Sequence, residues 1–175
     1  NALQAQLAPM IEDYLKELKN SIENIIGYST NDALANSTIR SFHETFMSKF
    51  DVEETFEDVL KTIRKAINKI KVYGINTQSK QVLDYSIYPD GLSAIVIGGH
   101  KLSRGLTLEG LSVSYFARNS KAYDTLMQMC RWFGYRPKYE DLCKVYLPIE
   151  SNEWYTFIAE AVNELYEELE IMSFQ

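Results

Sequence analysis

A short apolar run that ends in two glycines is the feature that most constrains the fold of this chain. Residues 94–97 read Ala-Ile-Val-Ile and are followed directly by Gly98 and Gly99. A β-branched run bounded by turn residues is typical of a strand buried on both faces. In open α/β sheets, ligands bind at the carboxyl ends of such strands. The sequence therefore predicts an α/β fold with a functional loop that begins at Gly98.

Periodic apolar residues predict three helices before this strand. The first covers residues 3–22, where apolar residues recur at steps of three and four. Asn36 or Ser37 is expected to cap the second helix, and the pair Asp51 and Glu54, which resembles a capping box, to open the third. The apolar stripe of the third helix is Phe56, Val59, Leu60, Ile63, Ile67 and Ile70. We expect all three helices to act as packing elements.

Strands and helices alternate along the rest of the chain. A turn-rich connection over residues 79–92 contains Pro89-Asp90-Gly91, a strong turn signal. Such alternation predicts a parallel or mostly parallel sheet covered by helices. The predicted strands are 71–76, 94–98, 111–116 and 142–147, and the predicted helices are 121–133 and 152–170.

The length of the chain, 175 residues, suffices for one domain with its own core. We expect a single domain with a helical part at 1–70, a sheet region at 71–150 and a terminal helix at 151–175. Because the chain begins without a Met inside an expected helix, we interpret it as a fragment of a larger protein.

Composition excludes several classes of function. No apolar run approaches the roughly 18 residues of a membrane span. Cys130 and Cys143 lie far apart and the chain has only two histidines, so we expect no zinc or other metal site. The cysteine usage fits a cytoplasmic location. The net charge of −6 argues against a general polyanion binder, but basic residues crowd the middle of the chain and predict a local positive patch. They are Lys101, Arg104, Arg118, Lys121, Arg131, Arg136 and Lys138.

One predicted helix carries candidate phosphate-binding residues. Asp124, Gln128 and Arg131 are spaced at i, i+4 and i+7, so they share one polar face. Arg136 lies just beyond the helix, and two arginines near one helix end suit forked contacts with phosphate. The alternative is a surface salt bridge of Arg131 with Asp124 or Glu109.

The loop after residue 98 is a candidate anion site. Its two glycines permit close backbone approach, and exposed N–H groups together with cations bind anions. The alternative is an ordinary strand-to-helix turn. The side-chain donors in this loop are His100, Lys101, Ser103 and Arg104, and Gly105 follows them.

These two segments resemble motifs of known ATPases. Residues 95–107 are similar to motif V of superfamily-two helicases, and residues 128–136, Gln-Met-Cys-Arg-Trp-Phe-Gly-Tyr-Arg, to motif VI. Residues 98–110, 114–116 and 123–136 resemble more closely the Z-one domain family. That family often carries an endonuclease label and is found attached to helicase-type ATPase cores in bacterial restriction and defence loci.

The resemblance implies a RecA-like second lobe of a helicase core, with three layers. It implies that Arg131 and Arg136 reach the ATP phosphates, that Gly105 and Thr107 face the nucleotide, and that Gln128 orders the motif. It also implies a nucleic-acid contact, with DNA the expected partner. The residues of that contact would be His100, Lys101, Ser103 and Arg104. Three features depart from the helicase pattern: Cys130 replaces the usual Gly, Thr107 replaces the usual Asp, and the spacing from Arg131 to Arg136 is long.

Several parts of an ATPase are missing from the chain. It has no G-x-x-x-x-G-K-[ST] loop and no acidic box to hold magnesium. ATP hydrolysis needs a phosphate cradle, a metal, a positioned water and a charge-stabilising arginine together. We therefore expect ATP and Mg²⁺ to be bound mainly by a partner, the N-terminal ATPase lobe of the same protein, and the isolated chain to be inactive.

Two other functions stay open. The chain could be a non-catalytic, helicase-derived interaction module. It could also be an endonuclease, since Pro89-Asp90 and Lys101 are parts of a metal-nuclease pattern. Gly99, however, stands where that pattern needs a second carboxylate.

Overall fold

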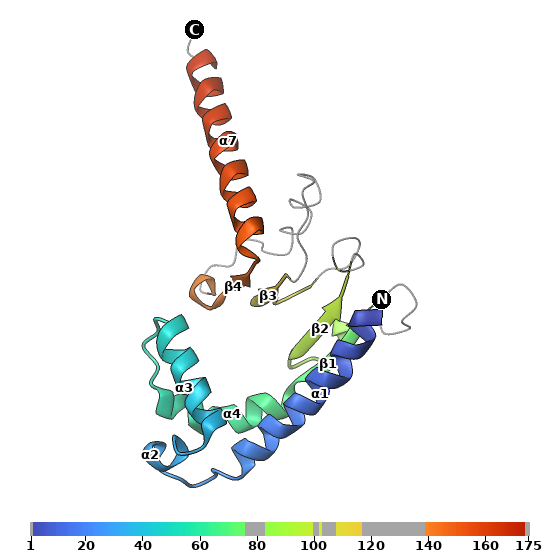
Figure 1. The fold of residues 1–175 in the computed structure, drawn as a ribbon, viewed down its shortest axis with the longest axis vertical. Coiled ribbons are helices and arrows are strands. Elements are labelled where there is room, and N and C mark those ends of the chain that lie inside the picture. Colours follow the sequence, from blue (N-terminus) through green and yellow to red (C-terminus); the bar gives the residue numbers. More distant parts are fainter. Residues whose placement is uncertain (1, 76–82, 100–101, 103–107, 117–138, 174–175) are drawn as a thin grey trace. The chain divides into compact units, whose positions relative to one another are not determined.

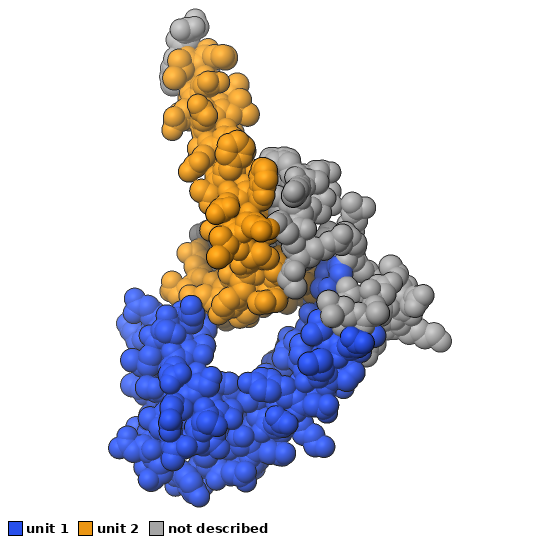
Figure 2. Space-filling model, in the orientation of Figure 1, with its two compact units in different colours: residues 1–106 blue, residues 107–175 orange. Residues whose placement is uncertain are grey.

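The computed structural model describes residues 2–75, 83–99, 102, 108–116 and 139–173. The chain divides into two compact units, residues 1–106 and residues 107–175 (Figure 2). The expectation of a single domain stays a prediction.

Within the described residues, four helices precede the first strand of the first unit. Their bounds are α1 Ala2–Glu23, α2 Thr30–Ala33, α3 Ser37–Lys49 and α4 Phe56–Lys69. The three predicted helices are confirmed as α1, α3 and α4. The short helix α2 was not predicted, because four residues carry too little periodicity to identify a helix. It begins where the backbone N–H of Asp32 donates to Ser29 Oγ at 3.2 Å.

The predicted cap of α3 is confirmed. The side-chain oxygen Oδ1 of Asn36 accepts hydrogen bonds from the backbone N–H groups of Thr38, at 2.9 Å, and Ile39, at 3.4 Å. An Asn side chain in this position satisfies N–H groups that have no partner within the helix.

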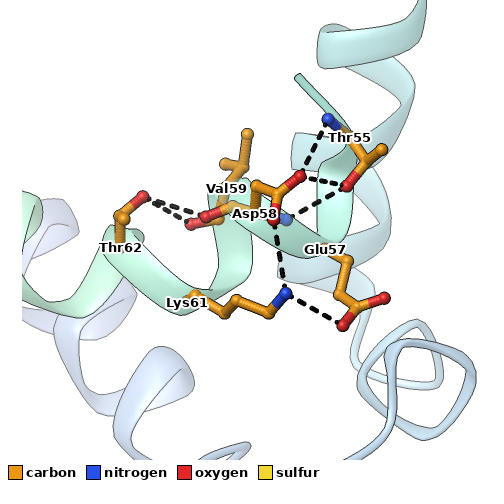
Figure 3. Close-up of polar contacts among 6 residues, drawn as sticks. All are labelled: Thr55, Glu57, Asp58, Val59, Lys61 and Thr62. Carbon is orange, nitrogen blue, oxygen red and sulfur yellow. Dashed lines mark hydrogen bonds and ion pairs between the residues drawn. The ribbon is translucent and has the colours of Figure 1, made fainter. Parts of the chain in front are cut away.

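The predicted start of α4 is wrong. Asp51 and Glu54 do not cap the helix; Thr55 and Asp58 form the capping box instead (Figure 3). The N–H of Asp58 donates to Thr55 Oγ1 at 3.3 Å, and the N–H of Thr55 donates to Asp58 Oδ2 at 3.3 Å. Thr55 stands directly before the first apolar residue of the helix, Phe56, so its hydroxyl reaches the free N–H groups of the first turn.

The helices pack around an apolar cluster. The whole predicted stripe of α4 packs in it or against it, which confirms the packing role of these helices. The ring of Phe56 lies 4.8 Å from that of His43 and 5.8 Å from that of Phe46, measured between centroids. The buried members of the cluster are Leu15, Ile22, Ala33, Ile39, Phe56 and Ile67.

Two parallel strands follow the helices in the described part of the first unit. Strand β1, Lys71–Ile75, pairs with β2, Ala94–Gly98, in a register that runs from Lys71 opposite Ala94 to Ile75 opposite Gly98. Helix α1 packs on both strands as well as on α3 and α4 (Figure 1). The strands were predicted within one residue of these bounds.

Strand β2 is less buried than predicted. Ala94 is exposed and the other four residues of the strand are half-buried, so the prediction that both faces of this strand are buried is wrong. The physical reason is that β1 is the one strand paired with β2 in the part of the chain that the structure describes. A run of β-branched residues indicates a strand but does not determine how many neighbours cover it.

The predicted turn between the two strands is confirmed. After the 3₁₀ helix η1, Tyr85–Ile87, the N–H of Gly91 donates to the carbonyl of Tyr88 at 2.9 Å. Gly91 has a φ of +86°, a conformation that residues with a Cβ rarely adopt.

The second unit has a second parallel pair. Strands β3, Val113–Tyr115, and β4, Lys144–Tyr146, are shorter than the predicted strands. Leu142, the predicted start of the last strand, belongs instead to the 3₁₀ helix η3, Glu140–Leu142. Helix α7, Ile149–Ser173, extends beyond the predicted helix at both ends. The helix predicted at 121–133 lies outside the described residues.

The fold is thus mixed, with many helices and parallel strand pairs. Parallel pairing is confirmed, although the described strands form two separate two-stranded sheets. The RecA-like arrangement in three layers stays a prediction. Within the described ranges, none of the helices combines the length and the apolar content that a bilayer crossing needs.

Candidate functional site

The first predicted functional segment begins at the carboxyl end of a parallel pair. Gly98, the last residue of β2, lies opposite Ile75, the last residue of β1. The chain continues into residues 99–107 from one strand and into residues 76–82 from the other. Both segments therefore leave the same edge of the sheet, where ligands bind in open α/β sheets.

The backbone packs closely at this edge. A Cβ atom on Gly98 would lie 2.7 Å from the carbonyl oxygen of Ile75 and 2.6 Å from Cγ of Leu102. Real Cβ atoms are not found so close to other atoms, so this position requires glycine. The N–H of Leu102 also donates to the carbonyl of Gly99 at 2.9 Å, which turns the chain as it leaves the strand.

A second parallel pair precedes the second predicted functional segment in the chain. Tyr115 of β3 lies opposite Tyr146 of β4, and their ring centroids are 6.4 Å apart. One residue further on, the N–H of Phe116 donates to the carbonyl of Tyr146 at 2.9 Å. The chain leaves this edge after Phe116, and residues 128–136, the second predicted segment, lie further along the chain, outside the described residues.

A polar cluster at the opposite end of the first sheet was not predicted. The ammonium nitrogen of Lys71 donates to the hydroxyl of Tyr88 at 3.1 Å and lies 4.7 Å from the centroid of its ring. The hydroxyls of Tyr73 and Tyr88 share a hydrogen bond of 3.0 Å. The alternation of Lys71 and Tyr73 on one face of β1 was a visible signal, but the turn that brings Tyr88 to them is a tertiary feature.

This cluster shifts the ionisation of its two phenols in opposite directions. The hydrogen bond with Tyr73 lowers the pKa of Tyr88, and the hydrogen bond from Lys71 lowers it further. The pKa of Tyr73 is raised, first by its hydrogen bond with Tyr88 and then by partial burial. The cluster therefore favours a negative charge on Tyr88 over one on Tyr73.

The Pro-Asp pair of the endonuclease interpretation belongs to this same end of the sheet. Asp90 lines an open hollow together with Lys71 and Tyr88, before the start of β2. Gly99, the position of the missing second carboxylate, follows the other end of that strand. A strand of five residues spans about 13 Å between its first and last Cα atoms, so the two positions adjoin opposite ends of β2.

The predicted site residues themselves lie outside the described residues. The structure therefore tests none of their assigned contacts with ATP, Mg²⁺ or DNA. Across the described ranges, the His, Cys, Asp and Glu side chains form no group of three that could hold a metal ion. The predicted site residues are His100, Lys101, Ser103, Arg104, Gly105, Thr107, Gln128, Arg131 and Arg136.

Comparison with known proteins gives one match. The model of the Z1 domain matches residues 1–175. No curated protein and no solved structure shows a significant match to the chain.

Proposed function

The chain belongs to the Z1 domain family, and on that premise we propose that it is the C-terminal helicase-like lobe of a nucleic-acid-dependent ATPase. The parent protein would act in a bacterial restriction or defence system. Its N-terminal ATPase lobe would bind most of the ATP and Mg²⁺, and this chain would supply arginine fingers and a contact loop for DNA.

One observation carries the proposal. The loop of the first segment that resembles a helicase motif leaves the carboxyl end of a parallel strand pair after Gly98, and the chain leaves the carboxyl end of the other described pair after Phe116, before the second motif. This edge is where α/β sheets bind nucleotides. The absence of a Cβ at Gly98 lets the first segment leave the sheet against the carbonyl of Ile75, an approach that suits a loop whose backbone faces phosphates.

The proposed roles follow from the chemistry of each side chain. Arg131 and Arg136 would stabilise the charge that develops on the transferred phosphoryl group. Gly105 and Thr107 would face the nucleotide, and Gln128 would order the motif. The side-chain donors at residues 100–104 would contact the phosphate backbone of DNA. Contacts with phosphates supply most of the affinity in such complexes.

Arg131 in the intact parent protein tests the proposal. Arginine fingers contribute on the order of a thousandfold or more to turnover, so Arg131→Ala should depress DNA-stimulated ATP turnover by about that factor. In the Arg131→Lys variant, ATP turnover should fall nearly as far, because lysine lacks the planar fork. The melting temperature should shift little, and ATP affinity should fall less than turnover.

Arg64→Ala is the matched control. This exposed arginine of α4 donates from Nε to Glu23 at 2.7 Å, and surface pairs of this kind contribute little. Its loss should leave turnover unchanged. Near-normal turnover of the Arg131→Ala parent would refute the finger assignment. A wild-type parent with no ATP turnover would instead favour the non-catalytic module.

A further inference from the structure

Helix α7 carries a continuous apolar stripe with the spacing of a coiled coil. The steps between its members alternate between four and three residues, as at the a and d positions of a heptad. The members are Ile158, Val162, Leu165, Leu169 and Met172. The stripe spans about 21 Å along the helix at 1.5 Å per residue.

The C-terminal part of the stripe is uncovered in the second unit, whereas Ile158 and Val162 are half-buried. The exposed fraction is 54% for Leu165, 51% for Leu169 and 66% for Met172, and the aromatic side chains of Phe157 and Tyr166 on the same helix are exposed as well. Among the described elements, none packs extensively along α7, and Figure 1 shows its last turns extending away from β3 and β4. Contiguous exposed apolar surface on a folded chain marks an interaction site.

The charge of α7 has one sign throughout. The helix contains no lysine and no arginine. Its acidic residues are Glu150, Glu153, Glu160, Glu164, Glu167, Glu168 and Glu170. Glu168 adjoins the stripe between Leu165 and Leu169, at a heptad position that faces the flank of a partner helix.

This charge decides between the helices that could cover the stripe. A second copy of α7 would bring two helices of the same sign together, and like charges across an interface are unfavourable. A partner with lysine or arginine beside its apolar stripe would meet Glu168 with the opposite charge. Charge complementarity therefore favours a basic helix.

We propose that α7 is a docking surface for a basic amphipathic helix of a partner protein. The partner packs its aliphatic residues between Ile158 and Met172 and places a basic side chain beside Glu168. Docking covers the apolar side chains that the second unit leaves in water. This role is separate from ATP turnover and does not depend on Arg131.

Synthetic helices of about 28 residues, long enough to form a helix in water, test the proposal. The basic probe has Leu and Ile at its a and d positions and Lys at e and g, the acidic probe has Glu at e and g, and a third peptide scrambles the basic sequence. Fluorescence anisotropy with the full chain should show that the basic probe binds at least about tenfold more tightly than either other peptide. The affinity of the basic probe for the chain should fall with added salt.

Two variants of the chain locate the binding. Leu165→Ser combined with Leu169→Ser should weaken binding of the basic probe by about tenfold, whereas Asn163→Ala on the polar face should leave it unchanged. Far-UV circular dichroism checks that both variants keep their helix. Equal binding of the basic and scrambled probes, or an unchanged affinity of the double variant, would overturn the proposal. A dimer in sedimentation equilibrium that the double variant abolishes would show that a second copy is the occupant, which would overturn it too.

Discussion

Gly98 and Leu102 approach so closely that a Cβ on the glycine would lie 2.6 Å from Cγ of the leucine and 2.8 Å from its Cδ1. The carbonyl of Ile75 closes the other side of this space at 2.7 Å. The leucine side chain could move, but the carbonyl is held in the β1–β2 pairing. Glycine at residue 98 is thus a packing requirement of the sheet edge from which the functional loop leaves.

Gly98→Ala should destabilise the chain by roughly 1–3 kcal/mol, the usual cost of overpacking. The measurement is the free energy of unfolding in urea. Gly27 provides a contrast, because its φ is +81° and a Cβ added there would meet no atom within 4 Å. Asn tolerates that backbone conformation, so Gly27→Asn should lower the free energy of unfolding only slightly. Gly98→Asn should lower it at least as much as Gly98→Ala does. Equal losses at both positions would contradict the packing argument.

Thr55→Ala should lower the free energy of unfolding by about 1 kcal/mol, since it removes the side-chain cap of α4. Glu54→Gln, in the pair that the sequence first indicated, should be neutral, because Glu54 takes no part in the capping box. Thermal unfolding of the two variants beside the wild type measures the difference. A larger loss for Glu54→Gln would mean that α4 begins elsewhere.

The same capping box predicts that the stability of the chain depends on pH. The hydrogen bond from the Thr55 hydroxyl to Asp58, at 2.6 Å, lowers the pKa of Asp58, with further contributions from Lys61 and the Thr55 N–H (Figure 3). A lowered pKa means that the stabilisation is present above the ordinary value of about 3.9 and is lost as the pH falls through the folded-state pKa. Asp58→Asn should therefore be less stable than the wild type at pH 7, and the gap should close in acid. A gap that stayed constant in urea titrations down to about pH 2 would exclude this linkage.

Ile39→Ala should destabilise the first unit by about 2–5 kcal/mol, because the side chain is fully buried and its loss leaves a cavity. Met47→Ala on the same helix is the control, since 65% of that residue is exposed, and should change stability by less than about 0.5 kcal/mol. Urea unfolding of both variants gives the comparison. Similar losses would mean that α3 does not pack through Ile39.

Tyr88 should ionise at lower pH than an ordinary tyrosine, because its hydrogen bonds with Tyr73 and Lys71 favour the phenolate. The chain has 12 tyrosines, so the measurement is a difference titration of tyrosinate absorbance between the wild type and Tyr88→Phe. Lys71→Met should move the Tyr88 component to higher pH. If that substitution leaves the difference titration unchanged, Lys71 does not act on Tyr88 in solution.

The sequence by itself determined the local elements of this protein. The apolar periodicity of α1, α3 and α4 and the β-branched run of β2 are encoded within single segments, so their positions were predictable. The cap of α3 at Asn36 was predictable for the same reason, because a capping side chain bonds N–H groups only two or three residues away. The motif segments were likewise recognisable from contiguous residues.

The tertiary structure alone decided how those elements are covered and which distant residues meet. The sequence indicated Asp51 as the cap of α4, whereas the structure places the capping box at Thr55 and Asp58, directly before the buried Phe56. Burial of β2 depends on the number of its neighbours, and the cluster of Lys71 and Tyr88 depends on a turn that returns the chain to the start of β1. Contacts of this kind join residues far apart in sequence, and no periodicity within one segment encodes them.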